Sequence, residues 1–530
     1  MMNPLHYGLG YISPNVMIYT LSRRIVMAFG DDLFDNGIDT ILHEWFECYP
    51  LYVYCFLDIL NSEILVKLQR NLINSGQDHY VSQSPKAGKI LPYLRNLLKG
   101  NARVENVDIL FVSRYRPAVV DIAKALRTDY LFHSVINEIF TNPPHSRMAL
   151  VSVGGEGEHY TDERVDNFGL FDFLSLGILL RTTFRSLGLY LRYRGIVKKL
   201  SRIQRKMFNE FFSFPSLLYC NLIDSCLAKA IYYLKPKVIV ANDDVLIFKP
   251  NVSTDFKMVV VQSALIAEYS EKNKHTLFSS FLDNSLLSDY YCVSGPKYES
   301  LKKRFLKDTK KIVVTGQPRF DSLVNANRLF DGNEIRRKLG LNEGKKILLW
   351  TTEAHSLTLK ENKENIAAIY HAVSVLNNVQ LIIKLHPAED QQASLYGTNH
   401  SCVPIIAKRN QDLHKLLFVC DLMITKASAS ATEAAIMDKP IIILNLSGKP
   451  DIIPYVEKGV ALGVYRKEDL IPTIKHILFD LKVREKLAKA RERFVYDYAY
   501  LQDGKASERV ANLIVSLIEV QRSVNDIIAR

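Results

Sequence analysis

The segment that most limits how this chain can fold runs from Asp421 to Leu446, DLMITKASASATEAAIMDKPIIILNL. Its 26 residues contain an apolar strand pattern, a loop of small polar residues, a short helical pattern and a second buried strand. Because a helix connects the two strands, we expect them to lie parallel in one sheet. The first strand should end at the carboxyl edge of that sheet, just before Lys426. The segment therefore predicts an α/β fold.

The loop after the first strand has the composition of an anion-binding site. Residues 427–432 lead into a helix whose first N–H groups have no acceptors inside the helix, and a phosphate can accept from them. The hydroxyls of Ser428 and Ser430 add donors, and Lys426 adds a cation. Ser430 and Glu433 also have the S-x-x-E spacing of a capping box, so an ordinary helix start explains the same residues.

The composition limits the size and the compartment of the protein. A chain of 530 residues that is 48% hydrophobic exceeds what one core holds, so two large domains are expected. The seven cysteines are scattered and never spaced C-x-x-C, which indicates a reducing, metal-free environment. We find neither the roughly 18 consecutive apolar residues of a spanning helix nor a signal-peptide pattern. The expected location is the cytoplasm.

The positive charge is concentrated in one segment. Between Arg181 and Lys206 there are nine Lys or Arg and no Asp or Glu, so the rest of the chain carries only +3 of the formal net charge of +12. Apolar residues precede this segment and recur within it, a pattern that favours an anionic membrane surface, where each Lys or Arg contributes about 1 kcal/mol. A buried helix followed by a solvated basic face has the same pattern. We expect no nucleic acid partner, because no nucleic-acid-binding motif accompanies the segment.

Short buried strands alternate with helical patterns in two successive regions, which predicts two Rossmann-like parallel-sheet domains facing one cleft. One expected helix in the first region spans residues 118–140, and an Asp503-Gly504 break precedes the last helix. The expected divisions are a helical N-terminal region (1–105), a Rossmann-like acceptor domain (106–328) with a basic amphipathic insertion (about 168–206), a Rossmann-like nucleotide-donor domain (329–500) and a C-terminal helix (501–530).

Four motifs in order resemble one enzyme group. They are VVTGQPRFD (313–321), LIIKLHP (381–387), the 421–444 segment and DGKASERVANLI (503–514). Together they resemble the CDP-glycerol glycerophosphotransferase and capsular-polysaccharide glycosyltransferase group, which has the two-Rossmann-domain (GT-B) fold. The resemblance implies a metal-independent transferase without a cofactor. Such an enzyme moves a sugar or polyol phosphate from a nucleotide-activated donor to a cell-surface polysaccharide or lipid-linked acceptor, and the basic segment would hold it on the inner face of the membrane.

The resemblance also selects a candidate donor site. The family's His-Pro histidine lies there, which implicates His386, held extended by Pro387 after a buried strand. Arg319 could fork onto a phosphate or pair with Asp321, and Lys384 points either into the cleft or to solvent. In the family, the residue equivalent to Glu433 reaches the donor ribose. The candidate donor-binding residues are Arg319, Lys384, Lys426, Ser428, Ser430, Thr432 and Glu433.

A general base is expected in the first domain, in addition to His386. The loop GGEGEHY offers Glu156, Glu158 and His159 beside flexible glycines, although a solvated turn has the same composition. Asp243-Asp244 is an alternative acceptor or base site. No D-x-D pattern indicates a metal.

Two positions depart from the family pattern. Lys426 stands where the family usually has an acidic residue, and Gln262-Ser263 where it often has His-Gly, so the exact donor and one catalytic group are in question. A UDP-N-acetylglucosamine 2-epimerase-like enzyme is one alternative, because TTEAHSLTLKEN is similar to the strand-loop pattern of that family. A non-catalytic scaffold of the same fold is another.

Overall fold

The structure is a computed structural model that describes most of the chain from residue 106 onward. The described residues are 106–113, 117–121, 126–129, 132–141, 146–153, 165–197, 214–242, 255–262, 288–303, 311–352, 360–386, 393, 396, 404–408, 411–448, 451 and 453–528. The helical region expected at 1–105 lies outside them.

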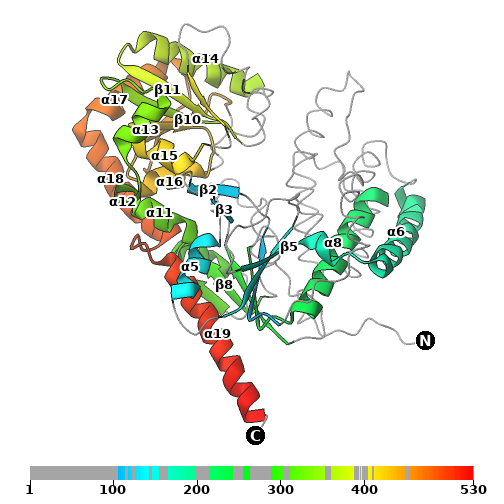
Figure 1. Ribbon diagram of the computed structural model, residues 1–530. Helices are drawn as coiled ribbons and strands as arrows, with labels where there is room; N and C mark the ends of the chain where they lie inside the picture. The colour runs from blue at the N-terminus through cyan, green and yellow to red at the C-terminus, as the bar shows by residue number, and fades with distance from the viewer. Residues whose placement is uncertain are drawn as a thin grey trace.

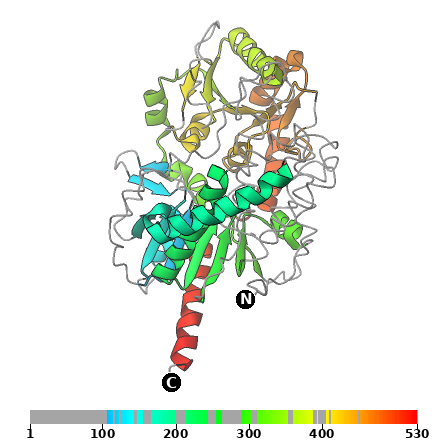
Figure 2. The same cartoon turned by 90° about the vertical axis from the view of Figure 1, so that its right-hand side faces the viewer.

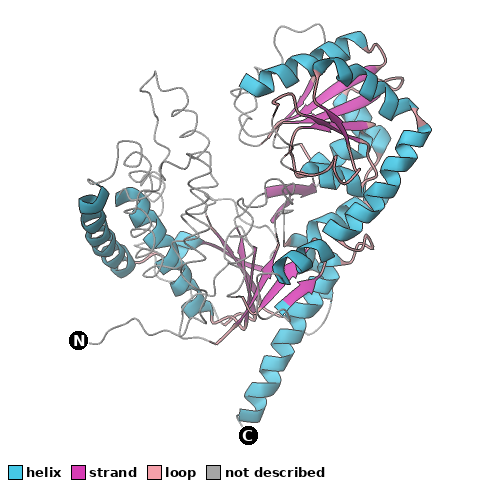
Figure 3. Ribbon diagram, turned by 180° about the vertical axis from the view of Figure 1, so that it is seen from behind, coloured by secondary structure: helices cyan, strands magenta, loops and turns pink. Residues whose placement is uncertain are grey.

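Two sheets form the framework (Figures 1 and 3). The strands of the N-terminal sheet are β1 (Ile109–Ser113), β4 (Met148–Ser152), β5 (Val165–Gly169), β6 (Val238–Asn242), β7 (Lys257–Val261), β8 (Tyr290–Val293) and β9 (Ile312–Val314). The strands of the C-terminal sheet are β10 (Lys346–Thr351), β11 (Val379–Lys384), β12 (Ile405–Ala407), β13 (Leu422–Thr425), β14 (Ile441–Leu444) and β15 (Leu462–Val464). Their spatial orders are β5-β4-β1-β6-β7-β8-β9 and β12-β11-β10-β13-β14-β15, and all pairs are parallel. The expected α/β fold with two Rossmann-like sheets is confirmed.

Helices cover these sheets. In the first half of the chain they are α5 (His133–Thr141), η4 (Leu170–Phe173), α6 (Leu176–Val197), α8 (Phe214–Leu234) and α10 (Pro296–Lys303). The connection between the sheets contains η8 (Pro318–Phe320), α11 (Asp321–Val324), α12 (Ala326–Leu329) and α13 (Gly332–Leu339). The remaining helices are α14 (Lys360–Val375), α15 (Leu413–Val419), α16 (Ser430–Ile436), η11 (Lys467–Asp469), α17 (Leu470–Phe479), α18 (Leu481–Ala499) and α19 (Ala506–Ile528).

The strands read as continuous apolar runs because helices bury both of their faces. In β1, all five residues are buried. Leu110 and Val112 belong to the cluster that α8 joins, whereas Ile109 and Phe111 belong to the cluster that α5 and α19 join. Burial of each such side chain stabilises the fold by about 1.5–3 kcal/mol.

The helix expected at 118–140 is wrong. The structure has a two-stranded antiparallel hairpin there, β2 (Pro117–Asp121) and β3 (Leu126–Asp129), and α5 begins only at His133. The β-branched pair Val119 and Val120 favours a strand. The carboxylate of Asp129 accepts a hydrogen bond from the Phe132 N–H (2.8 Å), which fixes the chain just before the helix.

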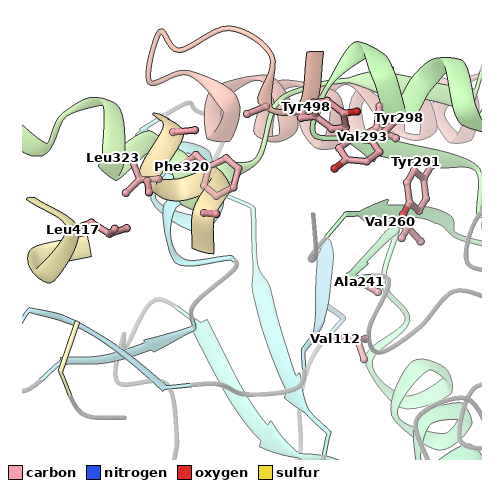
Figure 4. Close-up of a cluster of buried hydrophobic side chains, with 14 of the residues drawn as sticks. Val112, Ala241, Val260, Tyr291, Val293, Tyr298, Phe320, Leu323, Leu417 and Tyr498 are labelled. Carbon is pink, nitrogen blue, oxygen red and sulfur yellow. The ribbon is translucent and has the colours of Figure 1, made fainter. Parts of the chain in front are cut away.

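One apolar cluster runs through both halves of the protein. Figure 4 shows part of it, from Val112 and Ala241 in the N-terminal sheet, past Tyr298 and Tyr498, to Leu417 in α15. The rings of Tyr298 and Tyr498 meet edge to face with centroids 5.6 Å apart. Because Tyr498 lies on α18, this helix connects the C-terminal domain to the N-terminal sheet.

The last helix returns to the N-terminal domain. It begins where Asp321 accepts hydrogen bonds from the N–H groups of Ala506 (3.0 Å) and Ser507 (2.8 Å), so a residue of the connection caps α19. The expected break at Asp503-Gly504 is confirmed, and Gly504 has a φ of 70°. Downstream, Val510, Ile514 and Ile518 pack on α5 and the N-terminal sheet (Figure 1).

The described part of the basic segment lies in α6, which packs against α8 on one side (Figure 2). Thr182, Ser186 and Leu189 are buried on that side. The opposite side carries exposed apolar residues: Leu176, Leu180, Phe184, Leu187 and Leu191. The alternative interpretation, a buried helix followed by a solvated basic face, does not account for these exposed apolar residues. Among the described residues, no helix is long and apolar enough to cross a membrane.

Candidate active site

Hydroxyl groups from the end of β10 and from the loop after β13 meet at the carboxyl edge of the C-terminal sheet. The hydroxyls of Ser428 and Ser430 share a hydrogen bond of 2.7 Å, and Ser430 Oγ donates to Thr351 Oγ1 (3.4 Å). Thr425 Oγ1 donates to the carbonyl of Thr351 (3.3 Å). These contacts join the end of β10 to the loop after β13, and we name Thr351, Ser428 and Ser430 the hydroxyl cluster. Lys426 lies in the same loop and forms no ion pair with any described residue.

The start of α16 differs from both sequence-based interpretations. The N–H groups of Ser430 and Ala431 donate to the Oγ and the carbonyl of Ser428 (both 3.2 Å), and Thr432 N–H donates to the carbonyl of Ala429 (3.0 Å). These N–H groups already have acceptors within the segment. A phosphate would therefore contact the hydroxyl cluster and Lys426 instead of the start of the helix. The capping box is also absent, because no side chain caps α16 and Glu433 points elsewhere.

Glu433 is held between two basic side chains. Its Oε1 lies 3.1 Å from Arg319 Nη2, and its Oε2 lies 3.4 Å from His414 Nε2. Burial by itself raises the pKa of Glu433, but the Arg319 guanidinium and the His414 imidazole outweigh this effect and hold the pKa below its ordinary value. The alternative pairing of Arg319 with Asp321 is wrong, because Asp321 caps α19. Glu433 is therefore a buried carboxylate.

A tyrosine fixes the back of the loop. The hydroxyls of Thr432 and Tyr455 share a hydrogen bond of 3.0 Å, and Tyr455 also donates to the Ser428 carbonyl (3.3 Å). Burial raises the pKa of Tyr455, so its hydroxyl remains protonated. Thr432 is consequently committed to this contact, and its candidate role as a phosphate ligand remains a prediction.

His386 follows β11 and is exposed. Its N–H donates to Thr352 Oγ1 (2.9 Å), which ties it to the residue after β10 and places it at the same sheet edge as the hydroxyl cluster. Lys384 donates instead to the Lys408 carbonyl (2.8 Å) at the end of β12. The structure thus brings His386 to Thr352, the residue after Thr351, and directs Lys384 toward the neighbouring strand.

Gln262 directly follows β7, at the position where the sequence resemblance led us to expect a histidine. It is buried, its Oε1 accepts from Ser294 N–H (3.0 Å), and its carbonyl accepts from Gln317 Nε2 (2.6 Å). An amide in this position connects β7 and β8 to the GQPR segment. It offers no basic group at neutral pH.

Several candidates fall outside the described residues, namely Glu156, Glu158, His159, Asp243 and Asp244. Within the described ranges, no group of three or more His, Cys, Asp or Glu side chains is placed to hold a metal.

The sequence did not single out Thr351, His414 or Tyr455. Thr351 has a recognisable signal, because it ends a strand next to the one that precedes the loop. His414 and Tyr455 lie on other elements, and nothing in their local sequence connects them to Glu433 or Thr432.

Comparison with known proteins identifies the family. The model for CDP-glycerol:poly(glycerophosphate) glycerophosphotransferases matches residues 224–516, more than half of the chain. The chain belongs to this glycerophosphotransferase family. It is therefore a transferase that moves a group from a nucleotide-activated donor to a cell-surface polymer. No curated protein sequence matches it significantly.

Solved structures agree with the fold of a glycerophosphotransferase. A solved structure of the wall teichoic acid polymerase TagF is 14% identical, with a TM-score of 0.51 over 86% of this chain and 97% of the chain in that structure. A UDP-N-acetylglucosamine 2-epimerase from Neisseria meningitidis is 13% identical, with a TM-score of 0.48 over 78% of this chain and all of that one. At these identities the likeness concerns the fold alone, and it does not favour the epimerase alternative.

Proposed function

We propose that this glycerophosphotransferase moves a polyol phosphate from a CDP-linked polyol to a hydroxyl of a lipid-linked polymer. The observation that carries the proposal is Lys426, a cation without an acidic partner among the described residues, beside the hydroxyl cluster at the carboxyl edge of the C-terminal sheet. Ligands bind at this edge in open parallel sheets. Three hydroxyls and one cation suit the diphosphate of such a donor.

The reaction assigns distinct tasks to the two domains. The acceptor oxygen attacks the phosphorus that carries the polyol, the bond to the bridging oxygen of the diphosphate breaks, and CMP leaves. The acceptor hydroxyl proton passes to a base, for which Glu156, Glu158 and His159 remain the candidates. Lys426 and the hydroxyl cluster would balance the charge on CMP, and His386 would contact the transferred phosphate.

The proposal is tested by donor binding. CDP-glycerol should raise the melting temperature of the protein, because a ligand that binds only the native state stabilises it by about RT ln(1 + [L]/Kd). Ser430→Ala should weaken this shift at least several-fold, whereas Ser374→Ala, which removes an exposed serine of α14, should not. Equal binding of CDP-glycerol by the parent and by folded Ser430→Ala would contradict the phosphate site. Turnover with and without EDTA in the same series tests whether the donor suffices without a metal.

We also propose that α6 holds the enzyme on an anionic membrane. Its outer face presents Leu180, Phe184 and Leu191, which are 50%, 71% and 57% exposed, and the flanking Arg181 and Arg185 are exposed as well. Apolar side chains beside cations match the boundary between acyl chains and anionic head groups. This surface would bring the enzyme to lipid-linked acceptors on the inner face of the membrane.

Liposome sedimentation tests the α6 surface. The parent should sediment with vesicles that contain anionic lipid and should be released as salt rises. Phe184→Ser with Leu180→Ser should abolish sedimentation, whereas Tyr232→Ser, which removes an exposed aromatic ring on α8, should not. Equal recovery of the parent on neutral and anionic vesicles would contradict the proposal.

A further inference from the structure

Three polar side chains form a row at the carboxyl edge of the N-terminal sheet. Ser152 pairs with Ser113 across β4 and β1. Val112 pairs with Ala241 across β1 and β6, so Ser113 and Asn242 are the next residues along these two strands. Residues in register on neighbouring parallel strands point to the same face and lie about 4.8 Å apart. We name Ser152, Ser113 and Asn242 the polar row.

The polar row interrupts an apolar face. The residues two positions earlier on the three strands, Leu150, Phe111 and Val240, are buried in the cluster that α5 and α19 cover. The row continues the same face to its end, yet all three of its residues are polar and at least nine-tenths buried. Packing alone would favour apolar residues here.

Two members of the row carry buried oxygen atoms that have no hydrogen-bond partner among the described residues, Ser152 Oγ and Asn242 Oδ1. An unsatisfied buried group costs about 1–3 kcal/mol. Such a cost at the ends of β4 and β6, the two strands that flank β1, points to a ligand that supplies the missing bonds.

The third member is oriented by a carboxylate. Ser113 Oγ donates to Asp129 Oδ2 (2.6 Å), and Asp129 Oδ1 accepts from Phe132 N–H at the start of α5. Because its proton is used in this way, Ser113 Oγ presents only lone pairs to the row. The row therefore contains one oxygen that can only accept, Ser113 Oγ, one hydroxyl that can both donate and accept, Ser152, and the Asn242 amide, which has an accepting Oδ1 and a donating Nδ2.

We propose that the polar row binds the vicinal hydroxyl groups of a polyol acceptor. This inference rests on the proposed function, since it names the chemical class that the N-terminal domain takes as acceptor. Hydroxyls donate to Ser113 and Asn242 and accept from Ser152. An anion fits poorly, because it would face the lone pairs of Ser113 Oγ and the nearby Asp129 carboxylate. The polar row consequently binds the uncharged polyol part of the acceptor, and the phosphates of the acceptor bind elsewhere.

The row is closed to solvent in the unliganded chain, so polyol binding must accompany an opening of this edge. Opening lowers the observed affinity by the fraction of molecules that are open. Ligand contacts made by the row should thus be weak in isolation and measurable at millimolar polyol.

Saturation-transfer NMR with ribitol, in the absence of donor, tests the proposal. The parent should bind ribitol, and millimolar sulfate should not displace it. Asn242→Ala should weaken ribitol binding about 5- to 100-fold, the equivalent of one or two hydrogen bonds. Asn221→Ala is the matched control, because Asn221 is also buried with an unpartnered Oδ1 but lies between α8 and α6. It should lower the melting temperature and leave ribitol binding unchanged.

Ser152→Ala provides an independent variant should Asn242→Ala not fold, because the Ser152 hydroxyl makes no hydrogen bond whose loss would unfold the chain. The inference is overturned if the parent does not bind ribitol, if sulfate competes, or if the row variants lower only the melting temperature. CDP-glycerol binding is measured separately at the other sheet, so failure of the polar row and failure of the donor site are distinguishable.

Discussion

Arg319 Nη2 lies 3.1 Å from Glu433 Oε1, and this pair connects the segment between the two sheets to α16. The two side chains are 11% and 4% exposed, so little water screens their interaction. In this state Glu433 is bound by Arg319 and His414 rather than open to a ribose. Nucleotide binding that uses Glu433 must therefore compete with the Arg319 guanidinium.

Removing the Arg319 guanidinium should show how much this ion pair contributes to stability. Arg319→Met leaves a buried carboxylate without its main counter-charge, which should lower the free energy of unfolding by about 3–5 kcal/mol. The double variant Arg319→Met with Glu433→Gln should recover much of that loss. Urea unfolding of the single and double variants measures it, and additive losses would show that the two residues do not interact.

The same pair predicts a pH dependence. The pKa of Glu433 is lowered in the folded state, so its contribution to stability is present above the unfolded pKa of about 4.3 and is lost as pH falls through the folded value. Unfolding midpoints between pH 3 and pH 6 should fall more steeply toward low pH for the parent than for Glu433→Gln. Parallel profiles would contradict the assignment.

His386→Ala should reduce kcat/KM about 10²- to 10⁴-fold, because it would remove a positioned donor or charge from the transferred phosphate. The melting temperature should change little, since the side chain is exposed. His371→Ala, at an exposed position of α14, is the control. Near-parental turnover with a lowered melting temperature would assign His386 a structural role.

The raised pKa of Asp224 on α8 predicts a pH dependence of stability opposite to that of Glu433. Burial raises its pKa to about 6, and Arg185 opposes this only in part. A raised carboxyl pKa contributes stability at low pH that is lost as pH rises through about 6. Asp224→Asn should therefore match the parent near pH 4 and exceed it by on the order of 2–3 kcal/mol at pH 7. Asp255→Asn, which removes an exposed carboxylate, should leave the profile as it is.

The backbone of Gly295 lies so close to the backbone of α18 that there is no room for a Cβ atom. A Cβ there would lie 2.6 Å from the carbonyl carbon of Tyr498, at the place where α18 meets the N-terminal domain. Gly295→Ala should lower the free energy of unfolding by at least about 1–3 kcal/mol. Gly344→Ala, where a Cβ meets no atom within 4 Å, should be nearly neutral in the same thermal scan.

The sheets were predictable because their strands are buried on both faces and read as apolar runs, as KILLWT and IIIL do. The hairpin at 117–129 was not, since its short strands have no such run. In the site, Ser428 and Ser430 follow from the sequence, but the partners of Glu433 do not. Arg319 and His414 reach it from elements 114 and 19 residues away, and only tertiary packing specifies that meeting.

Helix α19, which Asp321 caps, packs on the N-terminal sheet, and this packing has a consequence for folding during synthesis. The helix supplies Val510, Ile514 and Ile518 to one face of the N-terminal sheet, although it follows both sheets in the chain. Domains that emerge first usually fold first. Here one face of the first sheet stays uncovered until the C-terminal sheet and α19 have also been made. Chaperone dependence, and aggregation of chains that stop before residue 506, are therefore properties that this topology imposes on the nascent protein.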